Sequence, residues 1–111
     1  MSFSVKTSGE FEEGLKFLAK KYPSIRNDYA ALLDDLEANP KSGDAVGKNC
    51  CKVLVAIASK NKGKSGGARV ITHLLVRLEG ETLYLLKIYD KSDLETISDK
   101  ELQNLLKDVL Q

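Results

Sequence analysis

Several residue types that usually anchor a small domain are scarce in this chain. Its 111 residues include no Trp, two Cys, two Pro, three Phe and four Tyr. Because aromatic rings are few, Leu, Val and Ile must fill the interior. Apolar runs stay far below the roughly 20 residues that span a bilayer, and residues 1–10 lack the apolar stretch of a secretory signal. We therefore expect one small cytosolic domain over residues 1–111.

The two cysteines are Cys50 and Cys51, which are neighbours in the chain. Adjacent residues in a strand point to opposite faces, so this pair is poorly placed to form a disulfide. A metal site needs more soft ligands, and the single histidine, His73, lies 22 positions after Cys51. We expect packing roles for the cysteines and neither a metal nor a cofactor.

Acidic residues are absent from the middle of the chain. The net charge is only +1, from 17 Lys and Arg against 16 Asp and Glu, yet residues 48–77 contain seven Lys or Arg and no acid. Four of these cations and three glycines fall in the stretch SKNKGKSGGARV at 59–70. This segregation predicts a local positive field that the total charge conceals.

Apolar residues recur at helical spacing in three segments. The first begins after Ser8, a possible N-cap, and is broken by Pro23. The second begins near Ser24 and stops before Pro40, because the residue before a proline avoids the helical region. The third follows the capping-box sequence SDKE at 98–101. We expect a helical hairpin near the start of the chain and one helix at its end.

Short β-branched segments predict the strands. We expect strands at 3–5, 51–57, 68–78 and 82–89, with loops at 41–49 and 58–67 and a turn at 79–81. The predicted order is β-α-α-β-β-β-α. This pattern indicates an α+β fold in which the helical hairpin packs on a small, mostly antiparallel sheet.

The hairpin of the last two predicted strands makes a geometric prediction. In an antiparallel pair the start of one strand lies beside the end of its partner, which brings Arg69 next to Tyr89 and Lys91. The loop that leads into Arg69 carries three further cations: Lys60, Lys62 and Lys64. A cationic site containing a phenol suits phosphate groups, because Arg can bind two phosphate oxygens at once. A solvated, lysine-rich loop is the alternative.

Three segments together carry a family resemblance: KGKSGGARVI at 62–71, YLLKIYDKSD at 84–93 and ISDKEL at 97–102. They resemble the RelE/HigB branch of the RelE/ParE toxin superfamily, whose members carry GK-x-GG-x-R-x-I followed by YLL-x-IY-x-K. The similarity runs from about residue 46 to 106. It implies a RelE-like fold and the toxin half of a bacterial type II toxin–antitoxin pair. The implied partners are a cognate antitoxin, the ribosome and mRNA, which RelE and HigB types cut.

The resemblance also implies roles for individual residues. Lys62, Lys64 and Arg69 fall in the phosphate-binding set, while Tyr89 and Lys91 fall where relatives keep catalytic or base-stacking groups. We expect Lys60 and Lys52 to add RNA contacts.

RNA can be cut without a metal when its 2′-hydroxyl attacks the adjacent phosphate. That reaction needs a base, a charge clamp and an acid. Lys64 and Arg69 are candidates for the clamp, and Lys62 or Lys91 for the acid. Tyr89 is a candidate base if nearby cations lower its pKa from about 10; its alternative role is to stack on a base.

Two positions depart from the family pattern. Many relatives carry K-x-R before the loop, whereas here Lys52 is followed by Val53 and Leu54, so one substrate cation is missing. Relatives often have Tyr after R-x-I, where this chain has Thr72-His73. His73 is either a second acid or base or a hydrogen-bonded packing residue.

These departures keep two alternatives open. One is a ParE-like toxin that inhibits gyrase and has no nuclease activity. The other is a degenerate member that only binds an antitoxin.

Overall fold

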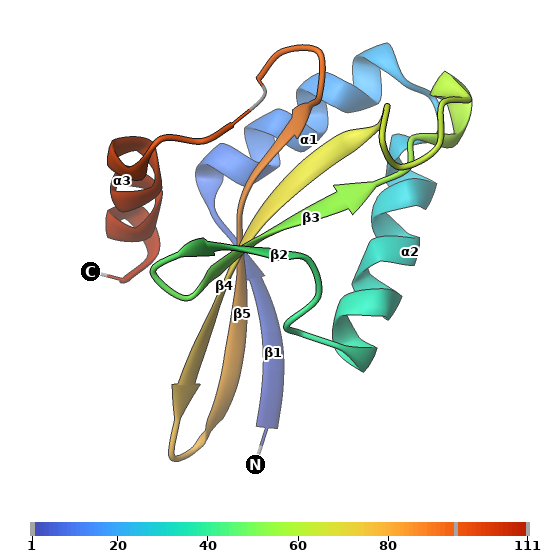
Figure 1. Cartoon of the computed structure of the whole chain (residues 1–111). Coiled ribbons are helices and arrows are strands. Elements are labelled where there is room, and N and C mark those ends of the chain that lie inside the picture. The colour runs from blue at the N-terminus through green and yellow to red at the C-terminus, as the bar shows by residue number, and fades with distance from the viewer. Residues whose placement is uncertain (1, 95, 111) are drawn as a thin grey trace.

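The computed structural model describes residues 2–94 and 96–110, which form an α+β fold with a mixed five-stranded sheet and three α-helices (Figure 1). The predicted α+β class is therefore confirmed. A short 3-10 helix, Ala58–Lys60, lies between the third and fourth strands. The elements are β1 (Ser2–Thr7), α1 (Gly9–Lys21), α2 (Ile25–Ala38), β2 (Asp44–Gly47), β3 (Cys50–Val55), β4 (Ala68–Arg77), β5 (Gly80–Asp90) and α3 (Asp99–Leu110).

The strand order across the sheet is β1-β5-β4-β3-β2. β1 runs parallel to β5, and the other neighbours are antiparallel. The sheet is thus mostly antiparallel, as expected, but it has one strand more than predicted. The prediction of a loop over 41–49 was wrong, because β2 lies inside it. β2 is mostly exposed and lacks apolar alternation, so only its pairing with β3 makes it a strand.

The helix boundaries follow the signals in the sequence. The Ser8 hydroxyl accepts a hydrogen bond from the Phe11 N–H at 3.1 Å, which caps α1. At α3, the Ser98 hydroxyl accepts from the Glu101 N–H at 3.1 Å. The Glu101 carboxylate forms an ion pair with Lys87 of β5, so it ties α3 to the sheet.

Two clusters of buried side chains lie on opposite faces of the sheet. The helical hairpin α1–α2 packs on one face through residues that include Phe11, Leu18, Leu36, Val70 and Leu85. The other cluster joins the sheet to α3 and contains Cys50, Ile71, Leu86, Tyr89, Leu102 and Leu105. Alternate residues of one strand therefore serve different cores. As a consequence, Tyr89 lies on the face that α3 covers.

Candidate functional site

The register of the β4–β5 hairpin brings Arg69 and Tyr89 together, as expected. Arg69 of β4 is directly opposite Tyr89 of β5 on one side and Leu54 of β3 on the other. Directly opposed residues share a face of the sheet, so these three side chains form one row. Leu54, the position at which the sequence resemblance led us to expect a cation, is therefore next to Arg69.

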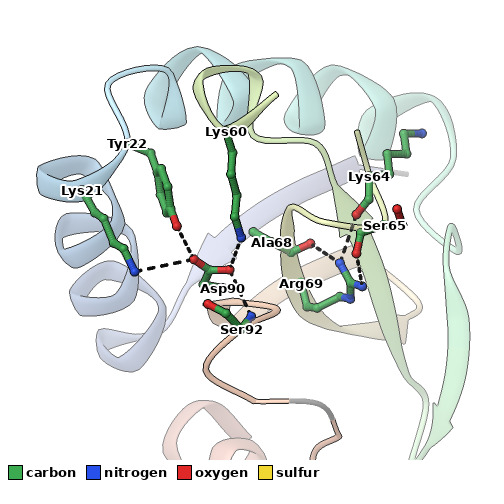
Figure 2. Close-up of polar contacts among 9 residues, drawn as sticks. All are labelled: Lys21, Tyr22, Lys60, Lys64, Ser65, Ala68, Arg69, Asp90 and Ser92. Atoms are coloured by element: carbon green, nitrogen blue, oxygen red, sulfur yellow. Dashed lines mark hydrogen bonds and ion pairs between the residues drawn. The ribbon is translucent and has the colours of Figure 1, made fainter. Parts of the chain in front are cut away.

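Arg69 is buried, with 8% of its surface exposed. Its guanidinium donates hydrogen bonds to the carbonyl oxygens of Lys64 at 3.1 Å, Ser65 at 3.0 Å and Ala68 at 3.3 Å (Figure 2). Arg69 thus holds the end of the 61–67 loop against the start of β4. Three of the five N–H donors of the guanidinium bond to the protein's own backbone, so Arg69 positions the loop.

The hydroxyl of Tyr89 is buried and has no hydrogen-bond partner among the described residues. Its ring belongs to the core beneath α3, with Leu102 and Leu105. Burial raises the pKa of Tyr89; the charges of Arg69 and Lys87 oppose that effect without reversing it. The condition under which Tyr89 would serve as a base, a lowered pKa, is therefore not met in this structure.

Lys60 forms an ion pair with Asp90, a residue that sequence reasoning missed. The carboxylate is fully buried at the end of β5 and lies 2.6 Å from the Lys60 ammonium. It also accepts hydrogen bonds from the Tyr22 hydroxyl at 2.5 Å and the Ser92 N–H at 3.1 Å (Figure 2). Lys21 adds a longer contact of 3.9 Å. Asp90 thus joins the end of α1, the lysine loop and β5.

These bonds determine the protonation of the pair. Burial by itself raises the pKa of Asp90, but the hydrogen bonds from Lys60, Tyr22 and the Ser92 backbone outweigh burial and hold this pKa below its usual range. The hydrogen bond to Asp90 in turn raises the pKa of Lys60. One signal in the sequence was available: Asp90 directly follows the apolar residues of the predicted strand 82–89.

The glycines of the loop have a packing role. A Cβ added at Gly67 would lie 2.0 Å from the Val55 carbonyl oxygen, and one at Gly66 would lie 2.6 Å from the Cβ of Lys62. The Gly67 N–H bonds the Lys64 carbonyl, and the Gly67 carbonyl accepts from the Lys91 N–H at 3.1 Å. Close approach of the Val55 backbone therefore accounts for Gly67, and close approach of the Lys62 side chain accounts for Gly66.

Cations remain exposed around a shallow cleft of about 360 Å³ at this rim of the sheet. Lys62 and Lys91 are exposed, and with Lys60, Gly66 and Ser92 they line the cleft. Since Lys60 is neutralised by Asp90, Lys62 and Lys91 supply the free positive charge. Ammonium groups at such a rim can bind phosphate oxygens as point charges.

Lys64 and Lys52 lie elsewhere. Both line a separate groove of about 560 Å³ between α2 and β3, together with acidic residues. The acids that share its lining are Asp28, Asp35 and Asp44. Figure 2 shows the Lys64 side chain extending away from the Arg69 guanidinium. The expected cluster of four lysines is therefore divided between two surfaces.

His73 is buried four residues further along β4 from Arg69, a distance of roughly 13 Å. Its Nδ1 lies 3.6 Å from the sulfur of Cys50, and the pKa of that thiol is raised by burial to about 11. The described residues contain no group of three or more His, Cys, Asp or Glu side chains that could hold a metal ion. The surroundings of His73 favour packing over acid–base chemistry at the cleft.

No protein-family model matches the chain. Within residues 2–94 and 96–110, no helix has the length and apolar character needed to cross a membrane.

Proposed function

We propose that this protein is a RelE/HigB-like toxin of a type II toxin–antitoxin pair that cuts mRNA on the ribosome in the cytosol. The observation that carries the proposal is the cleft at the end of the β4–β5 hairpin, where Lys62 and Lys91 remain exposed beside Gly66 and Ser92. A phosphate backbone is the ligand that such a site suits best. The resemblance of 62–71 and 84–93 to the toxin motifs supports RNA as the polyanion.

The proposed division of labour differs from the expectation at two residues. Lys62 and Lys91 contact the phosphate. The attacking 2′-hydroxyl loses its proton to water as its oxygen bonds to phosphorus, and one of the two lysines protonates the 5′-oxygen as its bond to phosphorus breaks. Arg69 acts as a positioning residue, because its bonds to the carbonyls of Lys64 and Ser65 fix the loop that carries the lysines. Tyr89 takes no base role while α3 covers it. An antitoxin that covers the cleft would protect the host cell.

A second candidate function is binding without cutting, as in a ParE-like gyrase inhibitor or a partner-binding module. Two observations favour it. The Tyr89 hydroxyl is buried with a raised pKa, and Leu54 stands beside Arg69 where relatives carry a cation. Both observations reduce the number of side chains near Arg69 that could assist cleavage.

Cleavage by purified protein separates these functions. The full chain is added to translating ribosomes carrying a defined mRNA, and new 5′ ends are mapped. The double variant Lys62→Ala, Lys91→Ala should lose at least about tenfold in cleavage, since it removes both free phosphate contacts. The control Lys16→Ala, Lys20→Ala removes equal charge from exposed positions of α1 and should cut normally. No new 5′ ends with the wild-type chain would refute the nuclease; gyrase inhibition would then be assayed.

A further inference from the structure

One side of β4 is open over its second half. β3 pairs with β4 only as far as Cys50 opposite His73, and the last backbone bond runs from the Leu74 N–H to the Asn49 carbonyl at 3.4 Å. β4 continues to Arg77, still paired with β5. Figure 1 shows that the strands β4, β5 and β1 extend beyond the end of β3, and that β4 is the edge strand of this three-stranded part.

The open edge presents main-chain hydrogen-bonding groups. The N–H and C=O groups of successive residues in an antiparallel strand alternate between its two neighbours. Since the Leu74 N–H points to the β3 side, the N–H and C=O groups of Val76 also point there. In the part of the chain that the structure describes, nothing pairs with this side beyond Asn49. Such an edge is a template for another strand.

A groove runs beside the same edge. It has a volume of about 720 Å³ and lies between the β2–β3 turn and β4. Its apolar lining includes Cys50, Leu75 and Val76, and the Val76 side chain is 60% exposed. An added strand would therefore find both backbone partners and apolar surface.

The groove is also basic. Lys41 and Lys48 are exposed on its lining, and none of the described residues that form the lining is Asp or Glu. Arg77, exposed at the end of β4, extends the positive charge. The same lining thus offers both apolar side chains and ammonium groups, so an added strand could pack apolar residues against Leu75 and Val76 and place acids beside the lysines.

The other two edges of the sheet are less suited to a partner strand. β2 has four residues and a register shift between Ala45 and Gly47, and short, bulged edges resist pairing. The outer edge of β1 carries the exposed cation Lys6, a charge of the kind that blunts such edges. The limb of β4 from Leu74 to Arg77 is straight by comparison, without a register shift toward β5 over that stretch.

We propose that the open limb of β4, Leu74–Arg77, is a docking site for an extended peptide segment of a partner protein in which acidic and apolar residues alternate. The segment would add antiparallel to β4 in line with β3 and lie along the basic groove. This surface is separate from the cleft that Lys62 and Lys91 line. The docking proposal can therefore be tested independently of the proposed nuclease activity.

The test uses the full chain and a fluorescein-labelled eight-residue peptide in which glutamate alternates with valine. Binding is followed by fluorescence anisotropy, and its location by amide chemical shifts. We expect saturable binding, with the largest shifts at Leu74–Arg77 and slowed hydrogen exchange of the Val76 N–H. A peptide with lysine in place of glutamate should bind at least about tenfold more weakly, because it meets Lys41 and Lys48 with like charge.

Two changes probe the hydrogen bonds and the charge. Val76→Pro removes the outward N–H while leaving the bonds to β5, a substitution that edge positions tolerate; it should weaken binding about tenfold. If this variant fails to fold by circular dichroism, N-methylation of the peptide's central amides makes the same test on the intact protein. The double variant Lys41→Glu, Lys48→Glu should weaken binding similarly, and the control Lys16→Glu, Lys20→Glu on α1 should not.

Three outcomes of the peptide experiment would overturn the proposal. They are equal binding of the acidic and basic peptides, shifts centred on β1 or β2, and no binding at millimolar peptide. A dimer in sedimentation that Val76→Pro dissociates would also overturn it, since the occupant would then be a second copy of this chain.

Discussion

At the scale of single residues, surroundings decide what Arg69 and Tyr89 can do. Both are near the predicted site and on the same face of the sheet. However, the guanidinium is occupied by the carbonyls of its own loop, and the phenol lies beneath α3 without a partner. From residue type alone, Arg69 was expected to bind phosphate and Tyr89 to act as a base. Local hydrogen bonding instead makes Arg69 a residue that holds its loop, and burial makes Tyr89 a core residue.

The unpartnered hydroxyl leads to a stability prediction. A buried polar group without a hydrogen bond is costly, so Tyr89→Phe should raise the free energy of unfolding by about 1 kcal/mol. The matched variant Tyr22→Phe removes a hydroxyl that donates to the buried Asp90 carboxylate and should lower it by about 2 kcal/mol. Urea denaturation of both variants measures these changes. A loss of stability in Tyr89→Phe would mean that its hydroxyl has a partner in solution.

At the scale of elements, α3 controls access to Tyr89. It is held by Leu102 and Leu105 in the core and by the ion pair between Glu101 and Lys87. Lys87 also lies 3.6 Å from Glu10 of α1, so one lysine joins helices on both sides of the β5 end. Because α3 has few other attachments, it is the element that can separate from the sheet with least disruption of the main core.

Leu105→Ala should release α3. The loss of a buried leucine side chain costs about 3 kcal/mol, and hydrogen exchange of α3 amides should accelerate by at least about tenfold. The Tyr89 ring should then become accessible, which a solvent-paramagnet NMR experiment on labelled tyrosines detects. Leu110→Ala, at a position 43% exposed on the same helix, is the control and should change exchange little. Equal exchange in the two variants would show that Leu105 does not hold the helix.

The row Leu54–Arg69–Tyr89 gives a second prediction for the sheet. Leu54→Arg adds a cation beside Arg69, at a position where the proteins that the sequence resembles carry one, so on the proposed function it should strengthen binding of single-stranded RNA. One added phosphate contact steepens the dependence of log K on log salt by about 0.7. Leu78→Arg adds the same charge at a residue 98% exposed on the hairpin tip. A filter-binding salt titration compares the two, and equal slopes would refute a role for position 54.

At the scale of the whole molecule, the features that depend on local sequence patterns could be predicted, whereas those that depend on bonds between distant residues could not. Apolar periodicity and capping residues located the three helices, and the hairpin fixed the approach of Arg69 and Tyr89. β2 was missed because its four residues carry no apolar alternation. The pairing of Lys60 was missed as well, since it depends on Asp90, whose partners come from the end of α1 and from a loop 30 residues away. Charge pairing across such distances leaves no periodic trace in a sequence.

Asp90 makes the stability of the whole fold depend on pH. Its folded-state pKa lies below the unfolded value, so its contribution is complete above the ordinary aspartate range, near about 4, and is lost as pH falls through that range toward the lowered value. Asp90→Asn should cost about 3 kcal/mol at pH 7, because it leaves Lys60 without its buried partner, and the difference from wild type should shrink on acidification. Urea denaturation at pH 7, 5, 4 and 3 measures this, with the exposed Asp93→Asn as control. A difference that stays constant across these pH values would mean that Asp90 is not ionised in the folded protein, and the link it makes between α1, the lysine loop and β5 would then be a neutral hydrogen bond.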